Sequence, residues 1–191
     1  KQKKALREEF DAHFINRITK AAESISMEES IPVALDWING RRTPDANQNL
    51  KGAITNLNLG ASAPHLFLSL IHSICFGSKA IVNRFKEEGV EIAQIVGIGG
   101  VAKKSKFIMQ TLADTLNMPV RVVESEQTPA LGAGIYAALA AGLFSSYREA
   151  SGVLGSKYIA EYHPNPSKVE IMKDLMKKYT KLGISIENLT Q

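Results

Sequence analysis

A buried apolar strand that runs straight into a pair of glycines and then into a helix restricts the fold of this chain more than any other feature. Residues 92–98 are mostly apolar, Gly99 and Gly100 follow at once, and residues 104–117 repeat apolar side chains at helical spacing. The glycines allow a tight turn and a close approach of a ligand to the backbone, and the N-terminus of the next helix offers unpaired N–H groups to an anion. The segment therefore predicts an α/β fold with a ligand-binding turn at the end of a strand.

Apolar periodicity predicts further helices and strands on both sides of this segment. Residues 62–89 form a long helix that opens with Ser62 and Pro64 and ends at Gly89, and residues 41–60 form a long loop without a clear period. This alternation predicts an α/β fold with at least one parallel pair, although three strands make a thin sheet whose neighbours are expected in sequence outside this chain. The other predicted helices cover residues 3–24, 130–143, 147–154 and 166–181, and the other strands cover residues 33–37 and 119–123.

Length and charge exclude several classes of protein. A chain of 191 residues with 45% apolar residues can form one sizeable domain with a real core. The net charge is +4, but the basic residues are scattered and aromatic residues make up only 7%, so nucleic acid is not an expected partner. The longest apolar run, residues 130–144, is too short to span a membrane, so a membrane is not an expected partner either.

Cysteine and histidine usage predicts neither a disulfide nor a metal site. Cys75 is the single cysteine, and no signal-peptide pattern opens the chain, so a reducing, cytoplasmic location is expected. The four histidines lack the spacing of a metal pair, and no metal ligand is predicted among them: His13, His65, His72 and His163.

Two functional interpretations of the glycine turn compete with a tight turn that binds nothing. Gly97 and Gly99 with Ala102 fit a relaxed dinucleotide fingerprint, and Glu124 follows the next strand, where an acid that binds ribose would lie. Such a fingerprint predicts a Rossmann-type nicotinamide-binding domain. Alternatively, Gly99 and Gly100 form the nucleotide turn of an actin-like ATPase domain.

A second glycine segment favours the ATPase interpretation. Gly132, Ala133 and Gly134 are expected in the first turn of the helix over residues 130–143, where two positions lack a side chain. Together with the turn at Gly99, they would form the two walls of a flat slot that suits adenine and ribose. A dinucleotide fingerprint does not require this second segment.

Three motifs, taken as a set, support a family resemblance. They are Leu35-Asp36-Trp37-Ile38-Asn39-Gly40-Arg41-Arg42-Thr43-Pro44, then Gly99-Gly100-Val101-Ala102-Lys103-Lys104-Ser105 with Gln110 and Asp114, and finally Ala130-Leu131-Gly132-Ala133. With these motifs, residues 21–143 resemble the C-terminal part of FGGY-family carbohydrate kinases, most closely those of the ribulokinase type. The chain then divides into a leading helix and linker (1–30), a family core (31–143) and C-terminal helices (144–191).

The resemblance implies an actin-like (ribonuclease H-like) ATPase domain that is one half of a two-domain sugar kinase. It implies that Gly99 and Gly100 contact the nucleotide through their backbone and that Ser105 lies near the adenosine. Arg41 and Arg42 lie in a loop of the family, where they would contact a phosphate or the other domain, or only anchor a surface loop.

The same resemblance shows which parts are missing from this chain. Family members carry an Asp-x-Gly-Thr phosphate loop and a sugar pocket in an N-terminal domain, and their catalytic base is an Asp that follows a Gly. Here there is no Asp-x-Gly-Thr, and none of the five Asp residues follows a Gly, so no catalytic residue is predicted.

We therefore expect a truncated portion of a kinase that uses ATP and Mg²⁺, with the Mg²⁺ site mainly in the missing domain. The full protein would phosphorylate a ketopentose, L-ribulose, in arabinose catabolism, whereas this portion alone would be inactive. The expected partners are ATP or ADP, the sugar through the missing domain, and a second copy in a homodimer. A non-catalytic actin-like interaction module is the other alternative.

Overall fold

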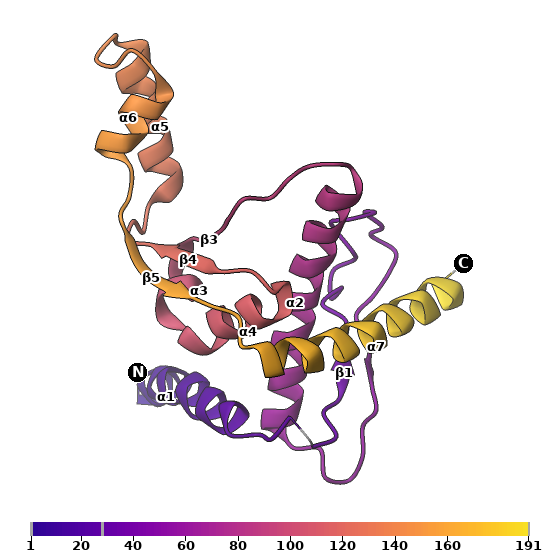
Figure 1. Cartoon of the computed structure of the whole chain (residues 1–191). Helices are drawn as coiled ribbons and strands as arrows, with labels where there is room; N and C mark the ends of the chain where they lie inside the picture. The colour runs from indigo at the N-terminus through magenta and orange to yellow at the C-terminus, as the bar shows by residue number, and fades with distance from the viewer. Residues whose placement is uncertain (1, 28, 191) are drawn as a thin grey trace. The chain divides into compact units, whose positions relative to one another are not determined.

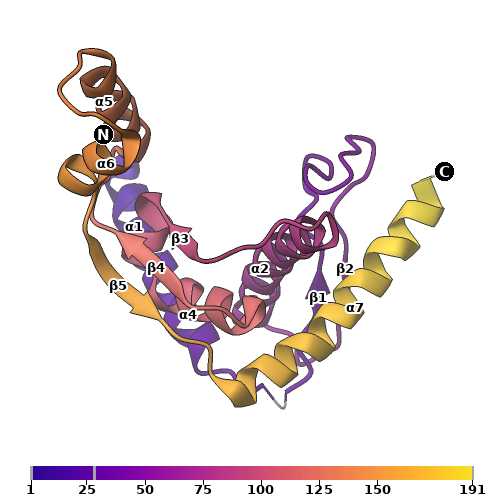
Figure 2. The same cartoon turned by 45° about the horizontal axis from the view of Figure 1, so that its top comes forward.

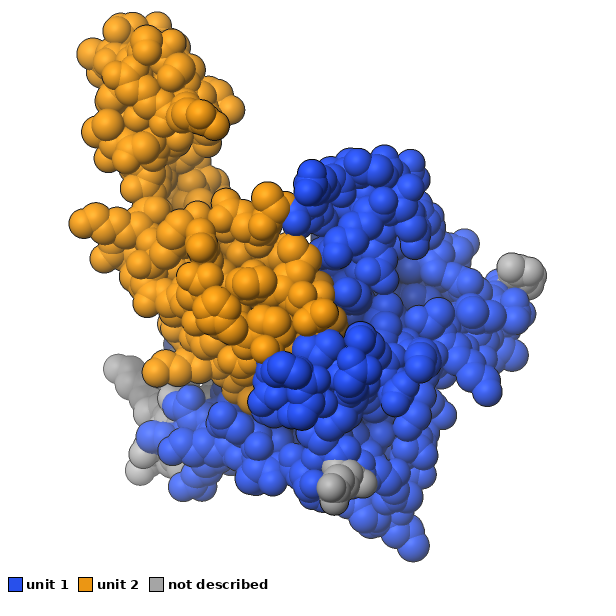
Figure 3. Space-filling model, viewed as in Figure 1, with its two compact units in different colours: residues 1–92, 165–191 blue, residues 93–164 orange. Residues whose placement is uncertain are grey.

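The computed structural model describes residues 2–27 and 29–190, which separate into two compact units. Unit 1 comprises Lys1–Ile92 and Asn165–Gln191, and unit 2 comprises Ala93–Pro164 (Figure 3). Unit 1 contains a two-stranded sheet and unit 2 a three-stranded sheet. The division of the chain into a leading helix, a family core and C-terminal helices within one domain stays a prediction.

Unit 1 combines long helices with a small antiparallel sheet. Val33 pairs with Thr55, and the first strand packs against two of the helices, α2 and α7 (Figures 1 and 2). Ser62 caps α2, as predicted, and His65 completes a capping box with it. The elements of unit 1 are α1 (Gln2–Glu23), β1 (Val33–Ala34), β2 (Ile54–Thr55), α2 (Ala63–Glu87) and α7 (Pro166–Thr190).

Two helical glycines shape the core of unit 1. A Cβ atom on Gly77 of α2 would lie 2.6 Å from the carboxylate of Asp36, and one on Gly183 of α7 would lie 2.9 Å from the ring of Trp37. Glycine weakens a helix interior by about 1 kcal/mol relative to alanine. At both positions, however, glycine allows a close contact that a side chain would prevent. Buried residues from β1, α2, α7 and the loops between them form this core: Val33, Leu35, Trp37, Leu50, Phe76, Met172 and Tyr179.

The helix α7 is longer than the sequence predicted. The prediction ended at residue 181, whereas the helix continues to Thr190. Leu182 and Ile186 pack against the core on the face that also carries Gly183. Tertiary packing therefore extends the helix across a glycine that local propensity would place at its end.

By length and composition alone, α2 could cross a membrane. Its buried residues, among them Leu68, Ile71, Cys75 and Phe76, lie inside unit 1. A single helix of this kind is weak evidence for a membrane segment, because a core helix of a compact unit meets the same criteria.

Unit 2 contains the predicted parallel pair. The strands β3 and β4 run parallel, with Val96 opposite Arg121, and a third strand, β5, joins the other edge of β4 in the antiparallel direction. The helices α5 and α6 pack against each other, away from this sheet in both views (Figures 1 and 2). The elements are β3 (Ile95–Gly97), α3 (Gly99–Lys104), α4 (Lys106–Leu116), β4 (Val120–Val123), α5 (Thr128–Ala140), α6 (Tyr147–Leu154) and β5 (Tyr158–Tyr162).

Several predicted elements are wrong in number or extent. The described chain has five strands rather than three, because β2 and β5 are mostly exposed and therefore carry no buried apolar pattern. The strand predicted over residues 33–37 is limited to Val33–Ala34, and the one over 92–98 to Ile95–Gly97. The helix predicted over 104–117 begins at Lys106, because Ser105 ends α3 and caps α4.

Candidate functional site

The two glycines of the turn after β3, Gly99 and Gly100, differ in backbone conformation. Gly99 has φ +82°, a conformation that strains residues with a side chain, so the backbone itself requires glycine here. Gly100 lies outside this left-handed region, and a Cβ atom added to it would meet nothing within 4 Å. Neither packing nor conformation within the described chain accounts for the absence of a side chain at Gly100.

Close packing explains Gly97, the first glycine of the dinucleotide interpretation, without a ligand. A Cβ atom on Gly97 would lie 3.2 Å from both the Cβ of Ala102 and the sulfur of Met109, so Gly97 allows the helices to pack closely on β3. Glu124 is exposed, and its backbone N–H donates to the carbonyl of Lys157 at 2.9 Å. The position of Glu124 after β4 agrees with the prediction, but Gly97 has a structural explanation that needs no ligand.

The second glycine segment is placed differently from the prediction. Since α5 begins at Thr128, with Pro129 in its first turn, Gly132 and Gly134 lie in the second turn and not in the first. Their N–H groups are therefore used inside the helix and are not free to bind an anion. Cβ atoms on Gly132 and Gly134 would meet nothing within 4 Å, and Ala133 is exposed, so the surface that they share is open.

Ser105 has a structural task that its sequence motif did not reveal. Its hydroxyl accepts a hydrogen bond from the N–H of Ile108 at 3.2 Å and so caps α4. Further along this helix, the amide of Gln110 donates at 2.8 Å to the buried carboxylate of Asp114 and at 2.8 Å to the carbonyl of His163. These bonds tie α4 to the end of β5.

Arg41 and Arg42 have different surroundings in unit 1. The guanidinium of Arg41 lies 5.0 Å from the ring centre of Trp37, donates to the carbonyl of Asp45 at 2.8 Å and pairs with the carboxylate of Glu187. Arg42 is exposed and forms no hydrogen bond or ion pair with another residue that the structure describes. Arg41 is therefore held by its own unit, whereas Arg42 is the arginine that is open to a partner.

Both arginines line a pocket of about 660 Å³ in unit 1. Its walls come from the loop after β1 and from facing residues of α2 and α7, including Ile74 and Ile184, which are exposed. The volume is in the range of small-molecule sites. The predicted nucleotide residues Gly99, Gly100, Ser105, Gly132 and Ala133 belong to unit 2 and do not line it.

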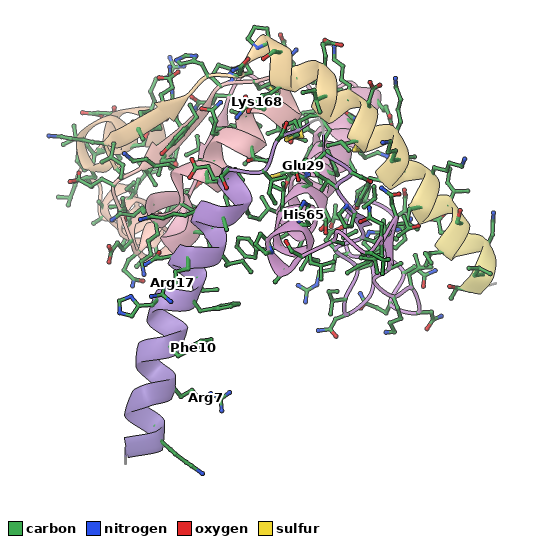
Figure 4. The ribbon with its side chains drawn as sticks, turned by 90° about the horizontal axis from the view of Figure 1, so that it is seen from below. Arg7, Phe10, Arg17, Glu29, His65 and Lys168 are labelled. Atoms are coloured by element: carbon green, nitrogen blue, oxygen red, sulfur yellow. The ribbon has the colours of Figure 1, made fainter. Side chains whose placement is uncertain are left out.

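A Ser–His–Glu cluster at the start of α2 was not predicted. The Oγ of Ser62 lies 2.8 Å from Nδ1 of His65. The Nε2 of His65 lies 3.1 Å from the carboxylate of Glu29, and Figure 4 labels these two residues. A hydrogen bond from the N–H of Ser26, together with the contact with His65, lowers the pKa of Glu29. The capping box at the start of α2 explains the contact between Ser62 and His65 without a ligand.

Lys103 is another residue of unit 2 whose contacts were not predicted from the sequence. Its ammonium donates at 2.9 Å to the carbonyl of Glu124 and at 3.0 Å to the carboxylate of Glu126. The signal available in the sequence was a lysine in the last turn of a short helix that follows the glycine turn. That signal names no partner, because Glu126 lies 23 residues further along the chain.

Sequence comparison decides which family the site belongs to. Residues 3–141 match the profile of the FGGY family of carbohydrate kinases, C-terminal domain. The chain belongs to this family. It is 41% identical over 184 residues to a ribulokinase of Vibrio parahaemolyticus, and this alignment covers 96% of the chain and 32% of that protein. It is 33% identical over 169 residues to a ribulokinase of Geobacillus thermodenitrificans, covering 86% of the chain and 30% of that protein.

Solved structures support the actin-like α/β fold of this FGGY domain. Xylulose kinase from Rhodospirillum rubrum matches with a TM-score of 0.79 and 20% identity, covering 92% of the chain and 34% of that structure. Plasmodium falciparum glycerol kinase with ADP matches with a TM-score of 0.70 and 19% identity, covering 87% of the chain and 33% of that structure. The predicted fold class is thus confirmed. The chain spans about a third of the length of the relatives that it matches.

Proposed function

We propose that this chain is the nucleotide-binding part of an ATP-dependent kinase that phosphorylates a ketopentose. The substrate is proposed as L-ribulose, and the role as arabinose catabolism in the cytoplasm, because the similar curated proteins cited above are ribulokinases. The Asp36-Trp37 motif and the two lysines between the glycine pair and Ser105 supported this branch of the FGGY family from the sequence alone. A homodimer remains part of the proposal.

Gly100 is the observation that carries the nucleotide proposal. It is exposed, its φ permits a side chain, and a Cβ atom there would have no neighbour within 4 Å. Glycine at such a position is explained when another molecule approaches the backbone closely. The position is at the C-terminal end of β3, in a parallel pair, where ligands of α/β proteins bind.

The chemistry of this chain is binding rather than proton transfer. ATP, when bound, supplies the phosphoryl group, and the sugar hydroxyl that receives it needs a carboxylate as base. No described residue matches the family position of that base, so this chain's contribution is to hold the adenosine end of the nucleotide. Gly99 and Gly100 would approach it through their backbone, while Gly132 and Ala133 offer an open surface on α5.

Mg²⁺ does not fit the described residues on their own. Among residues 2–27 and 29–190, no group of three or more His, Cys, Asp or Glu side chains could hold a metal ion. In kinases Mg²⁺ is bound by one or two carboxylates together with the phosphates of the nucleotide. We therefore propose that a Mg²⁺ site for this reaction includes the phosphates of the nucleotide and lies mainly in the N-terminal domain of the family.

The other interpretations have less support. Gly97 of the dinucleotide fingerprint is explained by packing, and the family match is to carbohydrate kinases. A non-catalytic interaction module would share the fold, but the family that the chain matches is one of carbohydrate kinases.

Nucleotide titration of the isotopically labelled chain, followed by amide NMR shifts, tests the proposal. ADP and AMP should bind weakly, with dissociation constants of roughly millimolar because only a few contacts are present. The shifts should centre on residues 99–105 and 132–134, and NAD should bind no more tightly than AMP. Tight NAD binding with shifts at Glu124 would support the dinucleotide interpretation, and no shifts with any nucleotide would reject the proposal.

A further inference from the structure

Lys103 connects the two segments of unit 2 to which nucleotide contacts are assigned. It lies in the last turn of α3, the helix that begins with Gly99 and Gly100. Its ammonium binds Glu124 and Glu126, in the segment that leads from β4 to α5. The side chain of Lys103 retains 24% of its full exposure, whereas that of Glu126 retains 78%, so most of the lysine side chain is covered by the protein.

The connection matters because α3 and α5 have little other contact. The two helices do not pack closely against each other, and α5 buries only Ile135 among its described residues. Gly100 on α3 and Gly132 on α5 are both open at the positions where a nucleotide would lie. A ligand that touches both segments needs them held to within a fraction of an ångström, which side-chain bonds between the segments can supply.

The present partners of Lys103 argue against a direct role on the phosphates. Two of the three N–H groups of its ammonium are already used, one on a backbone carbonyl and one on a carboxylate. The hydrogen bond from Lys103 lowers the pKa of Glu126, because the ammonium favours the ionised form of the carboxylate that it binds.

We propose that Lys103 is a positioning residue for the nucleotide site and that it acts through Glu124 and Glu126. It fixes the start of α5 relative to the glycine turn and does not touch the nucleotide. This inference rests on the proposed function, because it concerns the same site. It requires that the lysine support adenosine binding as much as ADP binding, since the charge of the phosphates plays no part.

Four variants of this chain test the inference by titration with ADP and, separately, with adenosine. Lys103→Met removes the ammonium and keeps most of the stem, Glu126→Gln removes the charge of the partner, and Lys103→Arg restores a cation. Lys104→Met is the matched control, because Lys104 is exposed on the same helix and adds only a weaker through-space attraction to Glu126. Melting temperatures of all variants are measured on the same samples.

Lys103→Met and Glu126→Gln should both raise the dissociation constants of ADP and adenosine about threefold, the size expected for a partly exposed pair. The amide shifts at residues 132–134 should weaken more than those at 99–105. Lys103→Arg should bind within twofold of the unaltered chain, and Lys104→Met should not differ from it. If Lys103→Met does not fold, Glu126→Gln, whose exposed side chain is replaced by a near-isostere, decides the question.

Two results would overturn the inference while leaving the proposed function in place. A loss of ADP affinity alone, with adenosine and Glu126→Gln unaffected, would show that Lys103 contacts the phosphates directly. Unchanged affinities in both Lys103→Met and Glu126→Gln would show that the pair has no part in binding. If the unaltered chain binds neither ADP nor adenosine, the proposed function itself fails, and the inference fails with it.

Discussion

The phenol of Tyr179 donates a hydrogen bond of 2.8 Å to the carboxylate of Asp36, which precedes it by 143 residues. Asp36 belongs to the Asp-Trp motif that supported the ribulokinase resemblance, whereas Tyr179 lies on α7, beyond the residues 3–141 that match the family profile. Next to this bond, Trp37 and Tyr179 meet edge to face, with ring centres 6.4 Å apart. The motif therefore anchors the C-terminal helix, and α7 is an integral part of unit 1.

Tyr179→Phe should destabilise unit 1 by roughly 1 to 3 kcal/mol, because it removes a hydrogen bond to a carboxylate inside a packed cluster. Denaturant unfolding measures the loss. The control is Tyr136→Phe, which removes a phenol that is 61% exposed and should change stability by less than about 0.5 kcal/mol. Equal effects of the two substitutions would contradict the anchoring role of the Tyr179–Asp36 bond.

Gly183→Ala should also destabilise unit 1, although alanine is the better helix former. The new methyl group would lie 2.9 Å from the Trp37 ring, which is buried and cannot move aside freely. Overpacking of this kind costs about 1 to 3 kcal/mol, more than the gain of about 1 kcal/mol in helix propensity. Gly152→Ala, in an open position of α6, is the control and should be neutral or stabilising. Thermal melts of both variants test the sign.

His72 should make the stability of unit 1 depend on pH between about 4 and 6.5. Burial lowers the pKa of His72 from 6.5 to about 4, because the charged imidazolium would be desolvated. In this range the unfolded chain binds a proton that the folded chain does not, so stability is full above pH 6.5 and falls as the pH drops towards 4. The lowered pKa corresponds to a loss of at most about 3 kcal/mol.

The measurement for His72 is the free energy of unfolding at pH 7 and at pH 5, compared with His72→Leu. The carboxylates of the chain also titrate at low pH, but they are common to both proteins, so the difference between the two pH slopes isolates the histidine. The unaltered chain should have the steeper slope. Parallel slopes would show that His72 is protonated in the folded state as easily as in the unfolded state.

Local signals in the sequence predicted the fold class and many helices but not the contacts between distant segments. The helix over 147–154 and the parallel pair were predicted correctly, because apolar periodicity and strand–turn–helix order are local properties. The full length of α7 depends on Trp37 and its neighbours, which lie far away along the chain. Similarly, β5 is defined by pairing with β4 and not by an apolar pattern of its own.

In the candidate site, the sequence likewise did not predict the separate roles of individual glycines. From the sequence, Gly97 and Gly99 were assigned to a dinucleotide fingerprint, and Gly99 and Gly100 to the competing nucleotide turn. The structure separates them into a packing glycine, a glycine required by its positive φ and a glycine that neither reason explains. This distinction depends on backbone angles and on neighbours such as Met109, which a motif does not encode.

Gly100→Val tests whether Gly100, the glycine that neither packing nor a positive φ explains, contacts the nucleotide. Because the φ of Gly100 permits a side chain and no atom lies within 4 Å of the added Cβ, the substitution should lower the melting temperature very little. The two methyl groups would nevertheless occupy the space that a bound nucleotide needs. The dissociation constant of ADP should therefore rise by about tenfold, or about 1.4 kcal/mol of binding.

Two further variants separate strain from lost contact in this measurement. Gly99→Ala places a side chain at φ +82° and should lower the melting temperature by itself, whether or not a ligand binds. Gly152→Val adds the same bulk at an open position of α6, to which no ligand contact is assigned, and should leave ADP binding unchanged. If Gly100→Val keeps both its stability and its affinity for ADP, Gly100 does not approach the nucleotide, and the main support for the proposed site is lost.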